Sequence, residues 1–186
     1  MLTDIVRKHI APADYADQII RTLPHGVFLT SCAHGRLNTM VIGWGSVGIE
    51  WGVPIFTACI RSGRFTRELL DENPEFTVSL PPQQRDASVV RFCGAHSGRN
   101  VDKFAHTGLT PTAPEVISVP AIKEFPLTFE CRVVHRYEQP LDSINSAFLH
   151  YYPQDIPGSD CGRNKDPHII YRGQIVSAYI IENPNS

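Results

Sequence analysis

The sequence has little of what would place a protein in a membrane or on nucleic acid. Its 186 residues include no long apolar run, and the N-terminal stretch MLTDIVRKHIAPADYADQ carries charges every few positions. We therefore expect no signal peptide, no membrane-spanning helix and a cytoplasmic location. The formal net charge of −2 gives no electrostatic reason to expect nucleic acid as a partner.

Cysteine is scarce, and its spacing is not that of a disulfide framework. The five cysteines, Cys32, Cys59, Cys93, Cys131 and Cys161, are odd in number and form no C-x-x-C pair, which predicts reduced thiols used in packing. The only hint of zinc ligands is Cys161 with His168 in CGRNKDPH, so we predict no metal site. A lone histidine at a strand start is more often structural, although His168 could also approach a ligand from a partner chain.

Regular alternation of strands and helices is absent as well, and strand patterns dominate. Extended segments are predicted at residues 25–46 with a turn at His34-Gly35, and at 54–61, 75–81, 125–139, 146–152 and 173–181. Helical spacing occurs at residues 12–23, which Pro24 ends, and at 63–72, 86–94 and 100–108. The order predicts a mainly β fold, an antiparallel barrel with flanking helices.

The length of the chain predicts one domain over residues 1–186, large enough for a sizeable core. Residues 152–167 are rich in Pro, Gly, Asp and Asn, which predicts a long loop that could cover a site or reach a partner chain.

Three glycines, Gly43, Gly45 and Gly48, match the dinucleotide-binding pattern G-x-G-x-x-G. That pattern works only where a helix follows the glycines, and here Ile49, Trp51 and other β-forming residues follow. The match is therefore interpreted as accidental. Glycines in a strand often mark a bulge or a place where a ligand lies against backbone.

Two later segments combine arginines, hydroxyls and helix starts. IRSGRFTREL, residues 60–69, offers guanidinium groups, hydroxyls and free helix amides, which together favour a phosphate site. A polar helix cap with surface arginines is the alternative. CGAHSGRNVDKF, residues 93–104, has the form of an anion-binding corner, with an ordinary capped helix as its alternative.

These segments, together with NTMVIGWGS at residues 38–46, resemble in order the flavin-reductase-like proteins, in particular their flavoredoxin-like branch. The resemblance covers most of residues 20–180 and implies an FMN-binding split β-barrel. It further implies a homodimer with FMN near the subunit interface, the ring against residues 38–46 and the phosphate at residues 61–66. Many relatives carry a different pair at Ser62-Gly63, so the phosphate assignment is firmer for Arg64 and Thr66. The expected FMN-binding residues are Asn38, Thr39, Met40, Ile42, Gly43, Ser46, Arg61, Ser62, Arg64, Thr66, Ser97, Gly98 and Lys103.

The resemblance implies an oxidoreductase in which NADH or NADPH is a transient co-substrate and the cofactor carries the chemistry. No catalytic side chain is named for that reason. Two alternatives stay open: an electron carrier that keeps its FMN and serves a partner protein, and a β-barrel interaction protein without flavin.

Overall fold

Antiparallel strands make up most of the fold. The computed structural model describes residues 5–82, 86–156 and 165–182. Its strands are β1 Val6–His9, β2 Val27–Ala33, β3 Arg36–Ile42, β4 Gly45–Glu50, β5 Val53–Arg61, β6 Glu75–Leu80, β7 Pro111–Thr112, β8 Ala121–Ile122, β9 Leu127–Glu138 and β10 His168–Glu182. Its helices are α1 Ala16–Thr22, α2 Phe65–Glu72, α3 Ala87–Ala95 and α4 Lys103–Thr107. Short 3-10 helices are η1 Pro12–Tyr15, η2 Leu23–His25, η3 Leu141–Ser143 and η4 Ser146–Tyr151. The mainly β prediction is confirmed.

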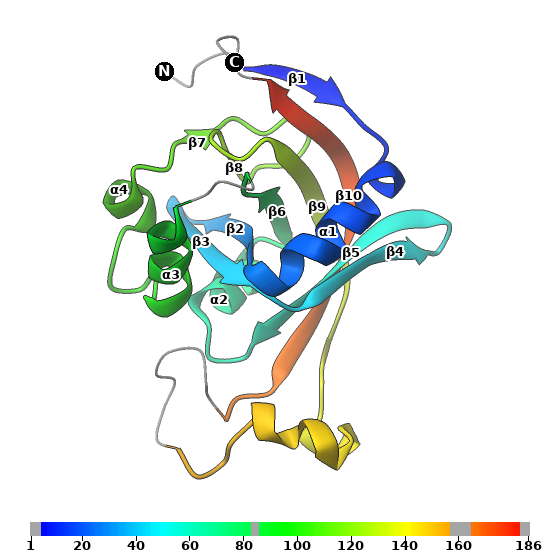
Figure 1. Ribbon diagram of the computed structural model, residues 1–186, viewed down its shortest axis with the longest axis vertical. Coiled ribbons are helices and arrows are strands. Elements are labelled where there is room, and N and C mark those ends of the chain that lie inside the picture. Colours follow the sequence, from blue (N-terminus) through cyan, green and yellow to red (C-terminus); the bar gives the residue numbers. More distant parts are fainter. Residues whose placement is uncertain (1–4, 83–85, 157–164, 183–186) are drawn as a thin grey trace.

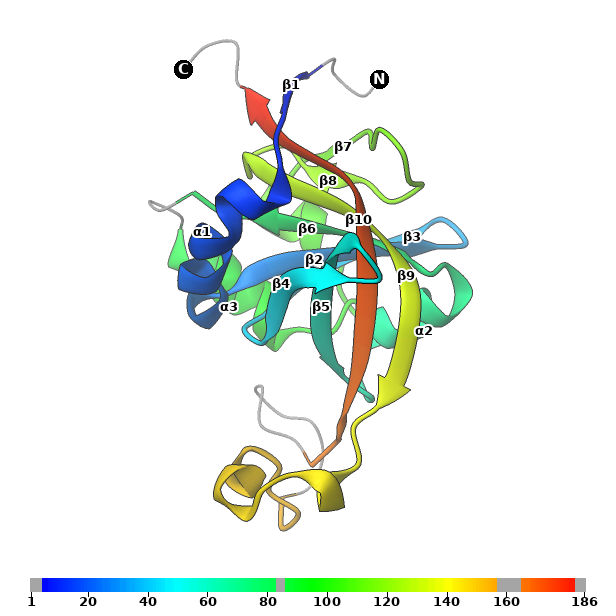
Figure 2. The same ribbon diagram turned by 90° about the vertical axis from the view of Figure 1, so that its right-hand side faces the viewer.

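The main sheet has eight strands in the order β3-β2-β6-β9-β10-β5-β4, with β1 paired to β10. Every pairing in it is antiparallel. The long strand β10 lies between β9 and β5, and the sheet twists so strongly that β2 and β3 run across the direction of β10 (Figures 1 and 2). The short β7 and β8 pair separately.

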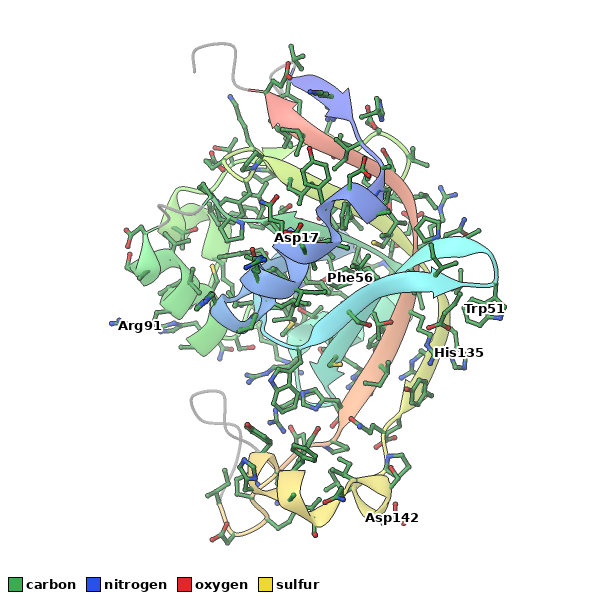
Figure 3. The ribbon with its side chains drawn as sticks, turned by 45° about the vertical axis from the view of Figure 1, so that its right-hand side comes forward. Asp17, Trp51, Phe56, Arg91, His135 and Asp142 are labelled. Atoms are coloured by element: carbon green, nitrogen blue, oxygen red, sulfur yellow. The ribbon has the colours of Figure 1, made fainter. Side chains whose placement is uncertain are left out.

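The curled sheet surrounds one large hydrophobic core. Phe56, Phe76, Phe129 and Tyr171 come from four different strands, and all are completely buried in it. Helix α1 covers one side and contributes Ile19 to the same core. Figure 3 shows Phe56 in the interior and Asp17 on the outward side of that helix. Large aromatic side chains contribute much of the burial that stabilises such a core.

Strand β9 shows how the pattern in the sequence becomes structure. Its alternate residues Leu127, Phe129 and Cys131 enter the core as their spacing predicts. Glu130, on the other face, is also fully buried. Its carboxylate accepts hydrogen bonds from the backbone N–H groups of Glu115 and Val116 at 2.7 and 2.8 Å. Residues 113–118 therefore cover the outer face of this half of the strand.

The predicted strand at residues 146–152 is wrong, because the structure has the 3-10 helix η4 there. The side chain of Asn145 accepts a hydrogen bond from the N–H of Ala147 at 3.0 Å and so starts a helical turn. The apolar Phe148 and Tyr151 remain exposed, so the alternation that predicted a strand has no sheet to pack against.

Other boundaries also differ from the prediction. The first helix is a short α-helix between two 3-10 turns, and Pro24 lies inside η2 rather than after the end. The chain turns away at Gly26, where φ is 99°. Strand β10 begins five residues before the expected start at residue 173. Strands β1, β7 and β8 were not predicted. The strands β7 and β8 have only two residues each, and β1 contains a single apolar residue, Val6.

Within the described residues, no helix is long and apolar enough to cross a membrane. Cys32, Cys59, Cys93 and Cys131 are free thiols. Cys161, considered above with His168 as a zinc ligand, lies outside the described residues, as does half of the predicted loop at residues 152–167.

Candidate functional site

A pocket of about 280 Å³ opens beside the second half of β3, and we call it the β3 pocket. Strand β3 forms one wall, the start of α2 another and the end of α3 a third. All three candidate segments from the sequence therefore meet in one place. Ten of the thirteen expected residues line the pocket: Asn38, Met40, Ile42, Gly43, Arg61, Arg64, Thr66, Ser97, Gly98 and Lys103.

The other three expected residues do not line the β3 pocket. The Thr39 side chain is buried on the opposite face of β3, where its hydroxyl lies 3.1 Å from that of Thr30. Ser46 lies opposite Thr57 in the β4–β5 hairpin. The backbone of Ser62 is occupied by Pro167 and Arg67. Alternation along a strand explains Thr39, since neighbouring residues point to opposite faces.

Arg64 is the cation in the pocket that has no partner. It stands at the N-cap of α2, and among the described residues its guanidinium makes no hydrogen bond or ion pair. Burial lowers its pKa, and the nearby Asp166 carboxylate partly reverses that effect. The side-chain amide of Asn38 donates to the Thr66 hydroxyl at 2.8 Å, which fixes both residues at the same helix start. A helix N-terminus next to an unpaired arginine suits a phosphate group.

Arg61 lines the pocket, but its guanidinium is engaged by backbone carbonyls. Its guanidinium donates to the backbone carbonyls of Tyr151 at 2.8 Å and Asp166 at 2.9 Å. It also lies 4.9 Å from the centre of the Tyr152 ring. Arg61 therefore fastens the segment after β9 to the end of β5, and Arg64 is better placed than Arg61 to receive a phosphate.

Lys103 is a buried cation at the inner end of the pocket. Its ammonium group donates to the carbonyls of Thr39 and Cys93, both at 2.8 Å. Burial lowers its pKa to about 8, so the ammonium form prevails at neutral pH. Burial raises the pKa of the neighbouring Cys93 thiol, which keeps that thiol protonated.

The pocket also contains a buried acceptor without a donor. The Oδ1 atom of Asn38 has no hydrogen-bond partner within the described part of the chain. A Cβ at position 98 would overlap this atom, so a glycine is required there for the close approach of the two segments. Buried polar atoms are nearly always paired, and an orphaned acceptor in a pocket is a candidate ligand contact.

The three glycines of the accidental G-x-G-x-x-G pattern serve different purposes. Strand β4 begins at Gly45 and contains Gly48, which confirms that the glycines do not begin a helix. Only Gly43 lines the pocket. A Cβ at Gly45 would lie 2.5 Å from the carbonyl oxygen of Thr57 on the paired strand, so that glycine serves the hairpin. A Cβ at Gly48 would meet nothing within 4 Å.

An aromatic group at the mouth of the pocket was not predicted. Trp44 lies 4.8 Å from the His168 ring and 5.2 Å from the Tyr151 ring, measured between centroids. The Tyr152 hydroxyl lies 2.7 Å from Nδ1 of His168. Burial, followed by the charges of Arg61 and Arg64, lowers the pKa of His168 to about 3, so the imidazole is neutral.

Some of the missed lining residues carried a signal in the sequence, and others did not. Trp44, Phe65 and Cys93 lie inside the three motifs and could have been included by position alone. Cys59 and His168 lie outside them. Only the pairing of His168 with Arg61 across β10 and β5 brings His168 to the pocket, and a strand register is not visible in one sequence.

Comparison with known proteins supports the resemblance. A family model described as the flavin reductase like domain matches residues 20–186. The flavoredoxin of Methanosarcina acetivorans is similar in structure, with a TM-score of 0.63 and 25% identity over 83% of this chain and 67% of that one. An FMN-binding domain of a flavin reductases-like enzyme from Shewanella baltica has a TM-score of 0.59 and 13% identity over 97% and 79%. The predicted split β-barrel is therefore confirmed.

Among curated proteins, an uncharacterized protein of Archaeoglobus fulgidus is 31% identical over 101 residues. The match covers 54% of this chain and 56% of that protein, so the chain spans little more than half the length of this relative.

Proposed function

Because the chain belongs to the flavin reductase-like family, we propose that it binds FMN in the β3 pocket as an oxidoreductase that uses NADH or NADPH. The observation that carries this proposal is the guanidinium of Arg64 at the start of α2, which has no partner in the part of the chain that the structure describes and lines a pocket built from all three family segments. An isolated surface arginine would carry little weight. Here the arginine faces a pocket that also holds an orphaned amide oxygen.

The residues present fit FMN at its phosphate end. Arg64 would pair with the phosphate, and the first backbone amides of α2 would add donors and a favourable partial charge. Thr66 is held by Asn38 at the same helix start. Arg61 stays engaged with backbone carbonyls and keeps the neighbouring segment in place.

The deeper part of the pocket fits the polar edge of a flat ring. The free Oδ1 of Asn38 would accept from a ring N–H, which would satisfy its missing hydrogen bond. The ammonium group of Lys103, held by two carbonyls, would favour negative charge on a ligand nearby. Gly43 leaves room against the strand, since no side chain fills that part of the wall.

The chemistry itself would belong to the cofactor, which when bound accepts a hydride from a nicotinamide. The chain's own groups bind it, orient it and limit the access of water. Trp44 and the neutral His168 form an apolar and uncharged rim at the mouth of the pocket. No side chain in the described pocket is needed as a proton donor for this role, so we assign none.

The likeness to a flavoredoxin at 25% identity favours a second candidate, an FMN-containing electron carrier that serves a partner protein. Affinity separates the two in part. A dissociation constant near 1 μM, about −8 kcal/mol, suits a flavin that exchanges, whereas one near 1 nM, about −12 kcal/mol, suits a retained group.

The test is titration of the flavin-free protein with FMN, followed by anaerobic addition of NADH or NADPH to the complex. The expected results are saturable binding and loss of the absorbance of oxidised flavin near neutral pH. Binding without reaction towards either nucleotide would support the electron carrier instead. Absence of FMN binding up to millimolar concentration would refute both candidates.

A further inference from the structure

A carboxylate lies beside the residue that we propose as the phosphate contact. Asp166 belongs to the segment that leads into β10, and its side chain is half-buried. A Cβ at position 63 would overlap its Oδ2 atom, so this oxygen fills the space over Gly63. Gly63 lines the β3 pocket and directly precedes Arg64. The phosphate end of the pocket therefore contains an acidic group as well as a basic one.

Backbone hydrogen bonds fix the position of this carboxylate. The guanidinium of Arg61 donates to the carbonyl of Asp166 at 2.9 Å, and the N–H of Ser62 donates to the carbonyl of Pro167 at 3.0 Å. The next residue, His168, already pairs with Arg61 in the β10–β5 ladder. None of these contacts uses the side chain of Asp166. A substitution that keeps the shape of this side chain should therefore leave the backbone in place.

The negative charge of Asp166 acts on both arginines at this end of the pocket. Burial lowers the pKa of Arg64, and the Asp166 carboxylate acts in the opposite direction. Burial also lowers the pKa of Arg61, and Asp166 is among the smaller causes that act on it. His168 adds no charge, because burial keeps its imidazole neutral. These groups together offer a net charge of roughly +1 to a phosphate monoester, which carries about −1.5 to −2 at pH 7.

We propose that Asp166 is a specificity-determining residue of the β3 pocket, whose carboxylate opposes a phosphate at Arg64 and so limits the preference for FMN over riboflavin. This inference rests on the proposed function, which puts the FMN phosphate at Arg64. A like charge next to an anion site weakens binding of the anion and spares an uncharged ligand. The repulsion also speeds dissociation of FMN, which favours a flavin that exchanges over one that is retained.

The variant is Asp166→Asn, which keeps the shape of the side chain and removes its charge. The matched control is Asp142→Asn, which removes one negative charge elsewhere. Asp142 is exposed on η3, does not line the β3 pocket and lies at the edge of the molecule in Figure 3. Fluorescence quenching gives the dissociation constants of the full chain for FMN and for riboflavin, at low and at high salt.

We expect Asp166→Asn to bind FMN about tenfold more tightly than the unmodified protein, with slower dissociation, and to bind riboflavin with unchanged affinity. The gain for FMN should shrink at high salt, because ions screen repulsion at a partly exposed site. A purely structural effect of the substitution would not show this dependence on salt. Asp142→Asn should match the unmodified protein with both ligands.

An unchanged ratio of the two affinities in Asp166→Asn would overturn the inference and leave the proposed function intact. Weaker FMN binding in this variant would overturn it too, since the carboxylate would then orient Arg64 for the phosphate. A gain of the same size in Asp142→Asn would attribute the effect to net charge and would also overturn the inference. Failure of the unmodified protein to bind FMN would refute the proposed function, and the inference with it.

Discussion

Two glycines that are only two positions apart make a sharp test at the scale of single residues. Gly43 lines the β3 pocket, and a Cβ there would be 3.5 Å from the carbonyl oxygen of Leu23, an ordinary contact. Gly43 lies between β3 and β4, so we expect Gly43→Val to fold with little loss of stability and to lose at least tenfold in FMN affinity. Flavin titration beside thermal unfolding of the flavin-free protein measures both effects.

Gly45→Ala is the matched comparison. Its Cβ would lie 2.5 Å from the Thr57 carbonyl, so this variant should lose about 1–3 kcal/mol of folding stability because the β4–β5 pairing must shift. If Gly43→Val binds FMN with unchanged affinity, Gly43 serves the barrel and not the ligand.

Arg64 allows the phosphate assignment to be tested separately from the ring. We expect Arg64→Ala to weaken FMN binding by about 1.5–3 kcal/mol, the value of a hydrogen bond to a charged group. Riboflavin lacks the phosphate, so its affinity should hardly change. Fluorescence quenching with the two ligands gives the comparison. Equal losses for both would place the phosphate away from Arg64.

His168 should make stability depend on pH. Its pKa is about 3 in the folded protein and 6.5 in its ordinary state. Between these values the unfolded chain binds a proton that the folded chain does not, so stability falls as the pH falls from 6.5 towards 3. The slope attributable to this group approaches about 1.4 kcal/mol per pH unit.

Urea unfolding at several pH values between 4 and 7 measures this slope, and His168→Gln should reduce it because glutamine does not titrate there. An identical slope in the variant would show that His168 is protonated as easily in the folded protein as in the unfolded chain.

At the scale of elements, the segment after β9 depends on Arg61 for its position. This segment includes η3 and η4, and it lies below the sheet in Figures 1 and 2. Figure 3 labels Asp142 at the edge of this segment. Arg61 holds two backbone carbonyls, one of them at the end of η4. We expect Arg61→Met to raise amide hydrogen exchange in residues 146–152 at least about tenfold, since charged hydrogen bonds are lost.

The control for this experiment is Arg67→Met. Arg67 donates to Ser62 and pairs with Asp71, and it makes no hydrogen bond to the described residues beyond β9. Exchange in residues 146–152 should stay at the level of the unmodified protein in this control. If Arg61→Met also leaves hydrogen exchange in this segment unchanged, the contacts of Tyr152 with His168 hold the segment without Arg61.

Elements specified by local sequence patterns were predictable from the sequence. Elements that depend on contacts with distant segments of the chain were not. Alternation gave β9, a turn at His34-Gly35 gave the β2–β3 hairpin, and β-forming residues after Gly48 excluded a nucleotide-binding helix. The same alternation failed at η4, because no neighbouring strand accompanies it.

The site followed the same rule. Ten residues expected from the motifs line the pocket. The sequence did not show which arginine lacks a partner among the described residues, because this depends on contacts between distant segments. Arg61 and Arg64 have the same chemistry in the sequence, and in the structure the carbonyls of Tyr151 and Asp166 engage Arg61. His168 entered the pocket through the register of β10 with β5.

At the scale of the whole molecule, the curled sheet accounts for where the pocket lies. The ends of β3 and β5, the start of α2 and the end of α3 all meet at one rim of the barrel. The interior of the barrel is filled by aromatic and aliphatic side chains, which leaves no room for a ligand inside it.

The molecule also carries an exposed apolar patch on the other side. At the tip of the β4–β5 hairpin, Ile49 is 69% exposed and Trp51 65%, and Tyr137 on β9 is 41% exposed. His135 lies between the two aromatic rings, 6.3 Å from Trp51 and 5.5 Å from Tyr137, and Figure 3 shows Trp51 beside it at the edge of the molecule. Contiguous exposed patches of this kind often mark contacts between proteins.

We predict that the protein is a homodimer and that this patch contributes to the contact. Light scattering at micromolar concentration should give twice the mass of one chain, and Trp51→Lys should shift the population towards monomer, because a buried unpaired charge is costly. Val6→Lys is the matched control, since Val6 is 54% exposed on β1, outside the patch. A dimer in both variants would show that the interface lies on another face of the molecule. The mass of a single chain for the unmodified protein at the same concentration would contradict the prediction.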